Sequence, residues 1–153
     1  MKYLWRVPTE IESCSSFPAT RYLITAAGGY FPILDHLPGG KLGVVVREGD
    51  FHVGQRAYLG FITSDDGGES WSETTRVAAA ERDPCHVAFG CTREGTLLVS
   101  YVLPHQYSDG AWDRGVIPQG PVYLSRSDDG GDTWTQREVD TSAIDAPQLN
   151  PYG

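Results

Sequence analysis

The sequence has little of what several common protein classes require. Its three cysteines, Cys14, Cys85 and Cys91, form an odd set without Cys-x-x-Cys spacing, so neither a disulfide framework nor a zinc ribbon is indicated and we expect free thiols. No segment keeps the 3.6-residue apolar period of an amphipathic helix, and no apolar run approaches the roughly 18 residues of a membrane span. The opening stretch MKYLWRVPTEIES has no apolar segment typical of a secretory signal, so a cytoplasmic location is the default expectation.

Positive charge is also scarce. Twelve basic residues stand against 20 acidic ones, a formal net charge of −8. This balance argues against nucleic acid as the main partner, because a phosphate backbone is bound by clustered Lys and Arg. No motif indicates a cofactor, and we expect none.

The residues that are abundant indicate an all-β protein. Eighteen glycines and 10 prolines divide the chain into short runs rich in Val, Thr, Tyr, Phe and Trp, which is typical of strands separated by turns. An octapeptide is written twice within this pattern, as SDDGGESW at 64–71 and SDDGGDTW at 127–134. The same four predicted strands accompany each copy: 30–37, 41–47, 57–63 and 72–78 for the first, and 83–90, 96–102, 121–126 and 135–140 for the second.

We therefore predict one partial domain over residues 1–153, built from a repeated four-stranded unit. Residues 1–29 would supply an edge strand of a neighbouring unit, 30–79 and 80–140 the two complete units, and 141–153 the start of a further one. Circular arrays of such units need about four to eight copies, so two units indicate a fragment or an incomplete ring. The remaining units are then expected partners.

The octapeptide itself indicates a structural turn between a third and a fourth strand. Its acids accept hydrogen bonds from the loop backbone, its glycines allow positive φ, and its Trp packs on the sheet. The residues assigned to this role are Ser64, Asp66, Gly68 and Trp71, and Ser127, Asp129, Gly131 and Trp134. A calcium loop is the alternative, but SDDGGESWSETT lacks the alternating acids and final Glu of an EF-hand, and we expect no metal there.

Both copies fit the pattern Ser-x-Asp-x-Gly-x-Thr/Ser-Trp and so resemble the Asp-box, or BNR, repeat. With the surrounding frame YFPILDHLPGGKLGVVVREG, ERDPCHVAFG and GTLLVSY, the chain resembles the sialidase superfamily from about Gly29 to Val139. The resemblance implies a β-propeller of four-stranded antiparallel blades, six in the parent protein. The box also occurs in sortilin-like receptors and photosystem assembly factors, so it indicates fold more firmly than activity.

For function, the resemblance implies hydrolysis of a terminal sialic acid or related acidic sugar. Arg47 then matches a carboxylate-binding arginine and Asp50 the acid/base catalyst, with His52 and Arg82 as further substrate-binding residues. A guanidinium suits this role because it binds a carboxylate bidentately. Equally, Arg47 could pair with a neighbouring acid and Asp50 could cap a turn beside Gly49.

The chain also departs from the sialidase pattern. The stretch Tyr30-Phe31-Pro32 lacks the Arg of the usual signature, and Tyr101, Tyr107 and Tyr123 lack a partner Glu that would mark a nucleophile. These departures favour the alternative function, a non-catalytic propeller that binds glycans or proteins through its loops. The long loop 103–120 carries Trp112, which suits stacking on a sugar ring or folding over its own blade.

Overall fold

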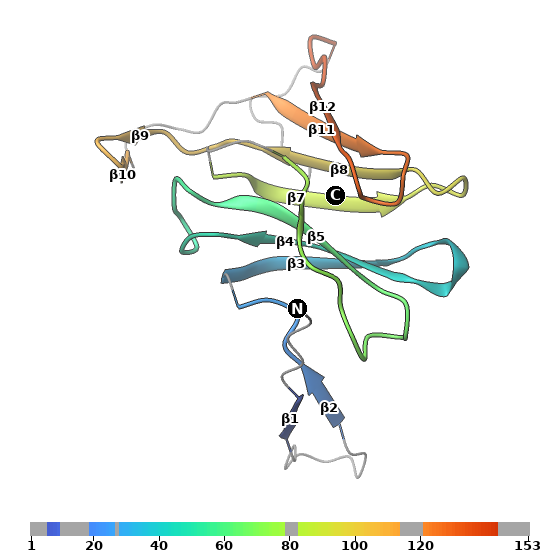
Figure 1. Ribbon diagram of the computed structural model, residues 1–153. Helices are drawn as coiled ribbons and strands as arrows, with labels where there is room; N and C mark the ends of the chain where they lie inside the picture. The colour runs from blue at the N-terminus through green and yellow to red at the C-terminus, as the bar shows by residue number, and fades with distance from the viewer. Residues whose placement is uncertain (1–5, 10–18, 27, 79–82, 114–120, 144–153) are drawn as a thin grey trace.

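The computed structural model describes residues 6–9, 19–26, 28–78, 83–113 and 121–143. The all-β prediction is confirmed: these residues form antiparallel sheets and one short 3-10 turn, η1 (Pro38–Gly40), with no α-helix among them. Two four-stranded sheets lie against each other (Figure 1). No helix in the described part of the chain has the length and apolarity needed to cross a membrane.

In each four-stranded sheet, the strands lie side by side in the order in which they occur along the chain. They correspond to the four strands that the sequence predicts for each unit. The first sheet contains β3 (Gly28–His36), β4 (Leu42–Glu48), β5 (Tyr58–Ser64) and β6 (Thr75–Arg76). The second contains β7 (Cys85–Cys91), β8 (Leu97–Val102), β11 (Val122–Ser127) and β12 (Thr135–Glu138). Two small hairpins complete the structure: β1 (Arg6–Thr9) with β2 (Ala19–Tyr22), and β9 (Tyr107–Ser108) with β10 (Ala111–Trp112).

Before the first sheet, β1 pairs with β2 in a two-stranded antiparallel hairpin, from Arg6 with Tyr22 to Thr9 with Ala19. Of the expected further unit at 141–153, residues 144–153 lie outside the described part of the chain.

The core lies between the two sheets and is built by alternation along the strands. In β4, Val45 faces the second sheet, whereas Val44 and Val46 face away from it and pack with Ile62 and Trp71. In the second sheet, Val99 and Tyr101 face the first sheet. Because Val99 and Tyr101 occupy the positions in β8 that Val44 and Val46 occupy in β4, the sheets stack head to tail, with corresponding faces turned the same way.

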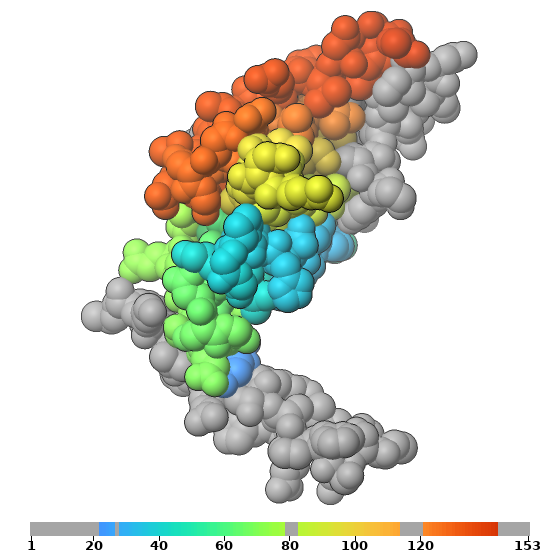
Figure 2. All heavy atoms as spheres, turned by 90° about the vertical axis from the view of Figure 1, so that its right-hand side faces the viewer, coloured from blue at the N-terminus to red at the C-terminus, as the bar shows by residue number. Residues whose placement is uncertain are grey.

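The two octapeptide turns, called Asp-box turns below after the pattern that they resemble, have the same hydrogen bonds and lie at the end of the molecule shown in Figure 2. In the first, Asp66 Oδ1 accepts from Ser70 N at 2.8 Å and from Ser64 Oγ at 2.9 Å, and Trp71 Nε1 donates to Gly68 O at 3.0 Å. The second turn repeats these bonds with Asp129, Thr133, Ser127, Trp134 and Gly131. Each turn is thus closed by its own side chains, as an Asx-type structural turn requires.

The opposite end of each sheet carries a second repeated feature, a bulge in the first strand. The β3–β4 register shifts between Tyr30 and Ile33, and the β7–β8 register shifts between Cys85 and Ala88. Phe31 and His86, inside these bulges, both have φ of 53°. Non-glycine residues seldom adopt this conformation, and bulges of this kind re-aim side chains beside functional sites.

We predict that Gly131→Ala destabilises the protein by about 2–4 kcal/mol, because a left-handed backbone and an overpacked contact add. Gly131 has φ of 100°, and a Cβ there would collide with the ring of Phe61 in the first sheet. Gly130→Ala is the matched control, since its φ is 78° but a Cβ would meet nothing within 4 Å. Urea unfolding should show a clearly larger loss for Gly131→Ala; equal losses would contradict close packing of this turn on Phe61.

We also predict that Asp66 in the first Asp-box turn makes the free energy of unfolding sensitive to acid. The hydrogen bond from the Ser70 side chain, followed by that from its backbone N–H, lowers the pKa of Asp66 to about 2. A carboxylate whose pKa is lower in the folded than in the unfolded state, where it is about 3.9, stabilises the fold above about pH 4 and loses this effect as the pH falls toward 2. The free energy of unfolding should therefore fall less steeply between these pH values in Asp66→Asn than in wild type. A slope in Asp66→Asn equal to that of wild type would contradict this role for the carboxylate.

Candidate functional site

Three segments meet at the end of the molecule opposite the Asp boxes. They are the β4–β5 loop (49–57), the two residues before β7 (83–84), and the segment after β8 that contains β9 and β10. All three lie on the left in Figure 1. This end carries the connections that differ between the two repeats, and loops that vary on a repeated scaffold are where binding function is usually found.

Arg47 lies at the centre of this end and is completely buried. Its Nε donates to Asp83 Oδ1 at 2.9 Å, and its Nη2 also binds Oδ1. The remaining contacts go to the β4–β5 loop, from Nη1 to Phe51 O at 2.6 Å and from Nη2 to Gly54 O at 3.3 Å. The guanidinium therefore fastens one loop of the first sheet to an acid that precedes the second sheet.

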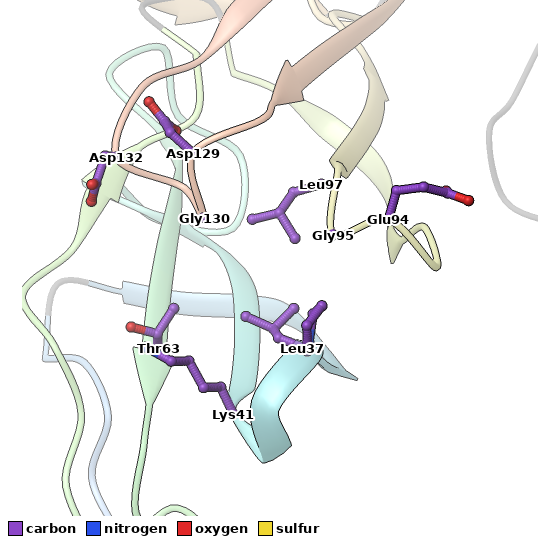
Figure 3. Close-up of a pocket in the computed structure, with 10 residues that line it drawn as sticks. Leu37, Lys41, Thr63, Glu94, Gly95, Leu97, Asp129, Gly130 and Asp132 are labelled. Carbon is purple, nitrogen blue, oxygen red and sulfur yellow. The ribbon is translucent and has the colours of Figure 1, made fainter.

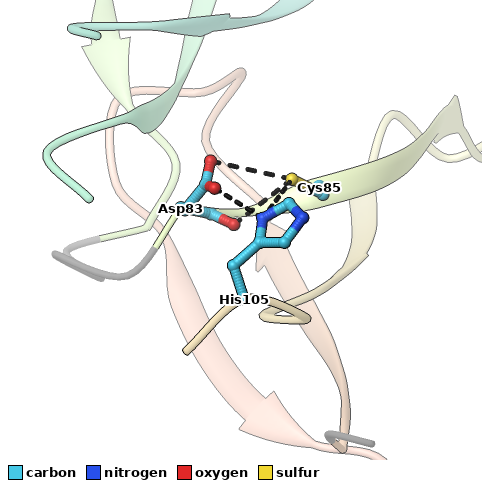
Figure 4. A group of neighbouring side chains, drawn as sticks. All are labelled: Asp83, Cys85 and His105. Atoms are coloured by element: carbon cyan, nitrogen blue, oxygen red, sulfur yellow. Dashed lines mark hydrogen bonds and ion pairs between the residues drawn. The ribbon is translucent and has the colours of Figure 1, made fainter. Parts of the chain in front are cut away.

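Asp83 is the acceptor that completes this network, and it too is fully buried. Its Oδ2 lies 2.6 Å from His105 Nδ1 and accepts from Tyr107 OH at 2.5 Å. Cys85 Sγ lies 3.7 Å from Oδ1 (Figure 4). Asp83 has φ of 48°, a conformation that a non-glycine residue adopts at a cost and that surrounding contacts must impose. One carboxylate thus holds groups from both sheets and from the long loop.

Asp50, the acid/base residue implied by the resemblance, closes its own loop. Its Oδ1 accepts from Phe51 N at 2.9 Å and its Oδ2 from Arg56 N at 3.1 Å. The Phe51 backbone hydrogen bond is the main cause that lowers the pKa of Asp50. A general acid working near neutral pH needs a raised pKa instead, so this geometry suits the turn-capping alternative.

Aromatic side chains surround the buried network. His52 stacks on Tyr30 with ring centroids 5.6 Å apart and lies 5.2 Å from Phe31, while Trp112 packs edge-on against His105 at 4.9 Å. Phe51 is 80% exposed, Phe31 41% and Trp112 37%. These three are the only aromatic residues among the exposed large hydrophobic side chains of the described chain, and all belong to this end.

The remaining candidates are less available for chemistry. Tyr101 is buried and stacks on Tyr123 at 5.6 Å, and burial is the main cause that raises the pKa of Tyr101 to about 12. Arg82 lies outside the described residues.

Cys85, His105 and Asp83 contain the residue types of a catalytic triad but not its geometry. A triad uses both ring nitrogens of the His, one toward the acid and one toward the nucleophile. Here Asp83 Oδ2 and Cys85 Sγ, at 2.6 and 3.8 Å, both approach Nδ1. Burial, and then the charge of Asp83, raise the pKa of Cys85 to about 12, so this thiol is not an activated nucleophile.

Asp83 and Cys85 were not among the sequence-predicted site residues. The only available signal was the stretch ERDPCH before a predicted strand, which does not reveal that Arg47 and His105, distant along the chain, meet there. Predicted residues that the structure brings to this end are Arg47, Asp50, His52 and Trp112.

A concavity of about 420 Å³ lies at the Asp-box end, between the two sheets (Figure 3). Leu37, Lys41, Thr63 and Asp129 are among its lining residues. Its volume suits a small ligand. However, the Asp129 carboxylate already accepts bonds from Ser127 and Thr133 within its turn, so the loop end is the stronger candidate.

Comparison with known proteins assigns no family to the chain. No family model matches it, and no curated protein matches it. Among solved structures, a protein of unknown function from Dyadobacter fermentans DSM 18053 is 22% identical with a TM-score of 0.49. The match covers 70% of this chain and 35% of that one, so the chain spans about a third of that protein's length. Neither value is high enough to indicate a function.

We predict that Asp83→Asn destabilises the protein by about 3–5 kcal/mol, because removing one partner of a buried ion pair leaves an uncompensated charge. Arg47 and Asp83 are both fully buried. Asp128→Asn is the control, since Asp128 pairs with Arg126 at the surface and exposed pairs contribute little. Urea unfolding at neutral pH measures both; a loss for Asp83→Asn no larger than the control's would contradict a central role for this pair.

Proposed function

We propose that the protein is an Asp-box β-propeller, in whole or in part, whose loop end binds carbohydrate. The head-to-tail stacking supports the propeller: the second sheet packs on the first with the face that corresponds to the outer face of the first sheet. A heterologous contact of this kind can repeat until it closes into a ring or extends as an array. Trp71 and Trp134, which hold the same position in the two octapeptides, lie on corresponding faces of their sheets. Trp71 packs on the outer face of the first sheet and Trp134 on Phe61, between the sheets.

The exposed aromatic rings at the loop end carry the binding proposal. Phe31 lies against His52 in the first sheet's half of this end, where Phe51 is also exposed, and Trp112 lies against His105, which binds Asp83. Flat aromatic faces suit the apolar face of a sugar ring, and neighbouring polar groups fix its orientation. The backbone that presents Phe51 is itself fastened, because Phe51 O accepts from Arg47. A preorganised loop loses less entropy when a ligand binds.

Sialidase-like hydrolysis is the second candidate, favoured by the two Asp boxes and by the presence of Arg47 and Asp50 at the same end. It requires a guanidinium that reaches the substrate carboxylate and an acid with a raised pKa. Arg47 is instead saturated by Asp83 and two loop carbonyls, and the pKa of Asp50 is lowered. Binding without turnover is therefore the better-supported proposal for these residues.

The test is titration of the protein with sialyllactose and with lactose, followed by tryptophan fluorescence or calorimetry. Phe51→Ala and Trp112→Ala should each weaken binding about three- to tenfold, since a well-placed aromatic contact contributes about 0.5–1.5 kcal/mol. Phe51→Ala is a clean variant, because Arg47 contacts the backbone of Phe51 and not its ring.

Leu34→Ala is the matched control, since Leu34 is 53% exposed on β3 and away from the loop end, and its affinity should equal wild type. Unchanged affinity in both aromatic variants would contradict the loop-end site. Preference for sialyllactose over lactose would favour an acidic sugar. Release of free sialic acid, lost in Asp50→Asn, would favour the hydrolase instead.

A further inference from the structure

The Asp83, Cys85 and His105 side chains bring together the three ligand types that bind zinc-like ions. Their ligand atoms, a carboxylate oxygen, Sγ and Nδ1, all lie within 4.8 Å of one another, and this is the one such group of three or more His, Cys, Asp or Glu found among the described residues. Figure 4 shows the three side chains converging: Asp83 lies two residues before β7, Cys85 is the first residue of β7, and His105 lies in the segment after β8.

We propose that this group is a binding site for a divalent transition-metal ion of the Zn²⁺ class. The ligand set is the cysteine, histidine and carboxylate set that Zn²⁺ takes in proteins. The proposal does not depend on carbohydrate binding, because every contact that it uses lies beneath the aromatic side chains.

The two distances to sulfur fit tetrahedral coordination. Bonds of about 2.3 Å to sulfur and about 2.05 Å to nitrogen or oxygen place neighbouring S and N or O ligands about 3.6 Å apart. Cys85 Sγ lies 3.8 Å from His105 Nδ1 and 3.7 Å from Asp83 Oδ1. The other carboxylate oxygen, Oδ2, lies 2.6 Å from Nδ1, because a hydrogen bond joins these atoms. This hydrogen bond must break when the metal takes the lone pair of Nδ1, so the carboxylate that binds through Oδ1 has to part from His105.

The surrounding residues hold the ligands as an outer shell does in metal sites. Arg47 binds Asp83 Oδ1, and Tyr107 OH donates to Oδ2 at 2.5 Å. Such partners orient ligating carboxylates.

The proton balance of binding is simple. Cys85 S–H loses its proton to solvent as the S–metal bond forms. The proton between His105 Nδ1 and Asp83 Oδ2 moves through solvent to Nε2, so that the neutral imidazole coordinates through the lone pair of Nδ1 and one proton is released in all. Access is through His105, whose side chain is 14% exposed whereas that of Asp83 is fully buried. Three protein ligands leave a fourth position for water or another small ligand.

Co²⁺ titration of the metal-free, reduced protein tests the site directly, because a cobalt–thiolate bond gives an ultraviolet charge-transfer band that oxygen and nitrogen ligands do not give. One equivalent should produce this band, and one equivalent of Zn²⁺ should abolish it. Cys85→Ser should abolish the band, whereas Cys91→Ser, which changes the other described thiol, should retain it. Tyr107→Phe should retain the band with affinity reduced about 10- to 100-fold, as expected of an outer-shell partner.

No thiolate band at one equivalent of Co²⁺ in the wild-type protein would overturn the proposal, and this result needs no variant to fold. A band retained in Cys85→Ser, or lost in Cys91→Ser, would place the metal on another thiol and would also overturn it. If Cys85→Ser does not fold, as judged by circular dichroism, His105→Ala replaces it as the ligand variant, because His105 is partly exposed. It should lose at least about 100-fold in Co²⁺ affinity, beyond the outer-shell effect; a smaller loss would overturn the proposal.

Discussion

The buried ion pair between Arg47 and Asp83 is the constraint on which the loop end depends. Taking both charges out of water costs several kcal/mol for each ion, and their attraction offsets this only when the remaining hydrogen-bonding capacity is also satisfied. Here it is satisfied: the guanidinium also donates to Phe51 O and Gly54 O, and Asp83 also binds His105 and Tyr107. The pair therefore joins one loop from each sheet, so neither loop can move independently of the other.

The two ends of the molecule divide structural and functional roles. At one end, the repeated turns are closed by Asp66 and Asp129 through nearly identical bonds, because each turn uses only residues within its own octapeptide. At the other end, the connections differ in length and composition, and the contacts cross from one sheet to the other. The two turns stay alike because each is closed by residues of its own octapeptide. The loop end can differ from one unit to the next because its contacts run between units.

The carbohydrate and metal proposals concern two layers of the same end. The exposed rings of Phe51 and Trp112 form the outer layer, and Asp83, Cys85 and His105 form the inner one. His105 belongs to both, since it contacts Trp112 on one side and Asp83 on the other. An ion bound to the inner layer would thus fix the ring that supports Trp112, which is a physical route by which the two layers are coupled.

The strands, the turns and the two-unit organisation were predictable from the sequence, because alternation and turn chemistry act over a few residues. The octapeptides, for instance, indicated turns whose bonds span no more than four positions. The role of Arg47 was not predictable in this way: its position at a strand end was recognisable, but its partner Asp83 is 36 residues away. Only the stacking of one sheet on the other brings Arg47 of the first unit to Asp83 of the second, because contacts between units depend on how the faces pack and not on any pattern within a single unit.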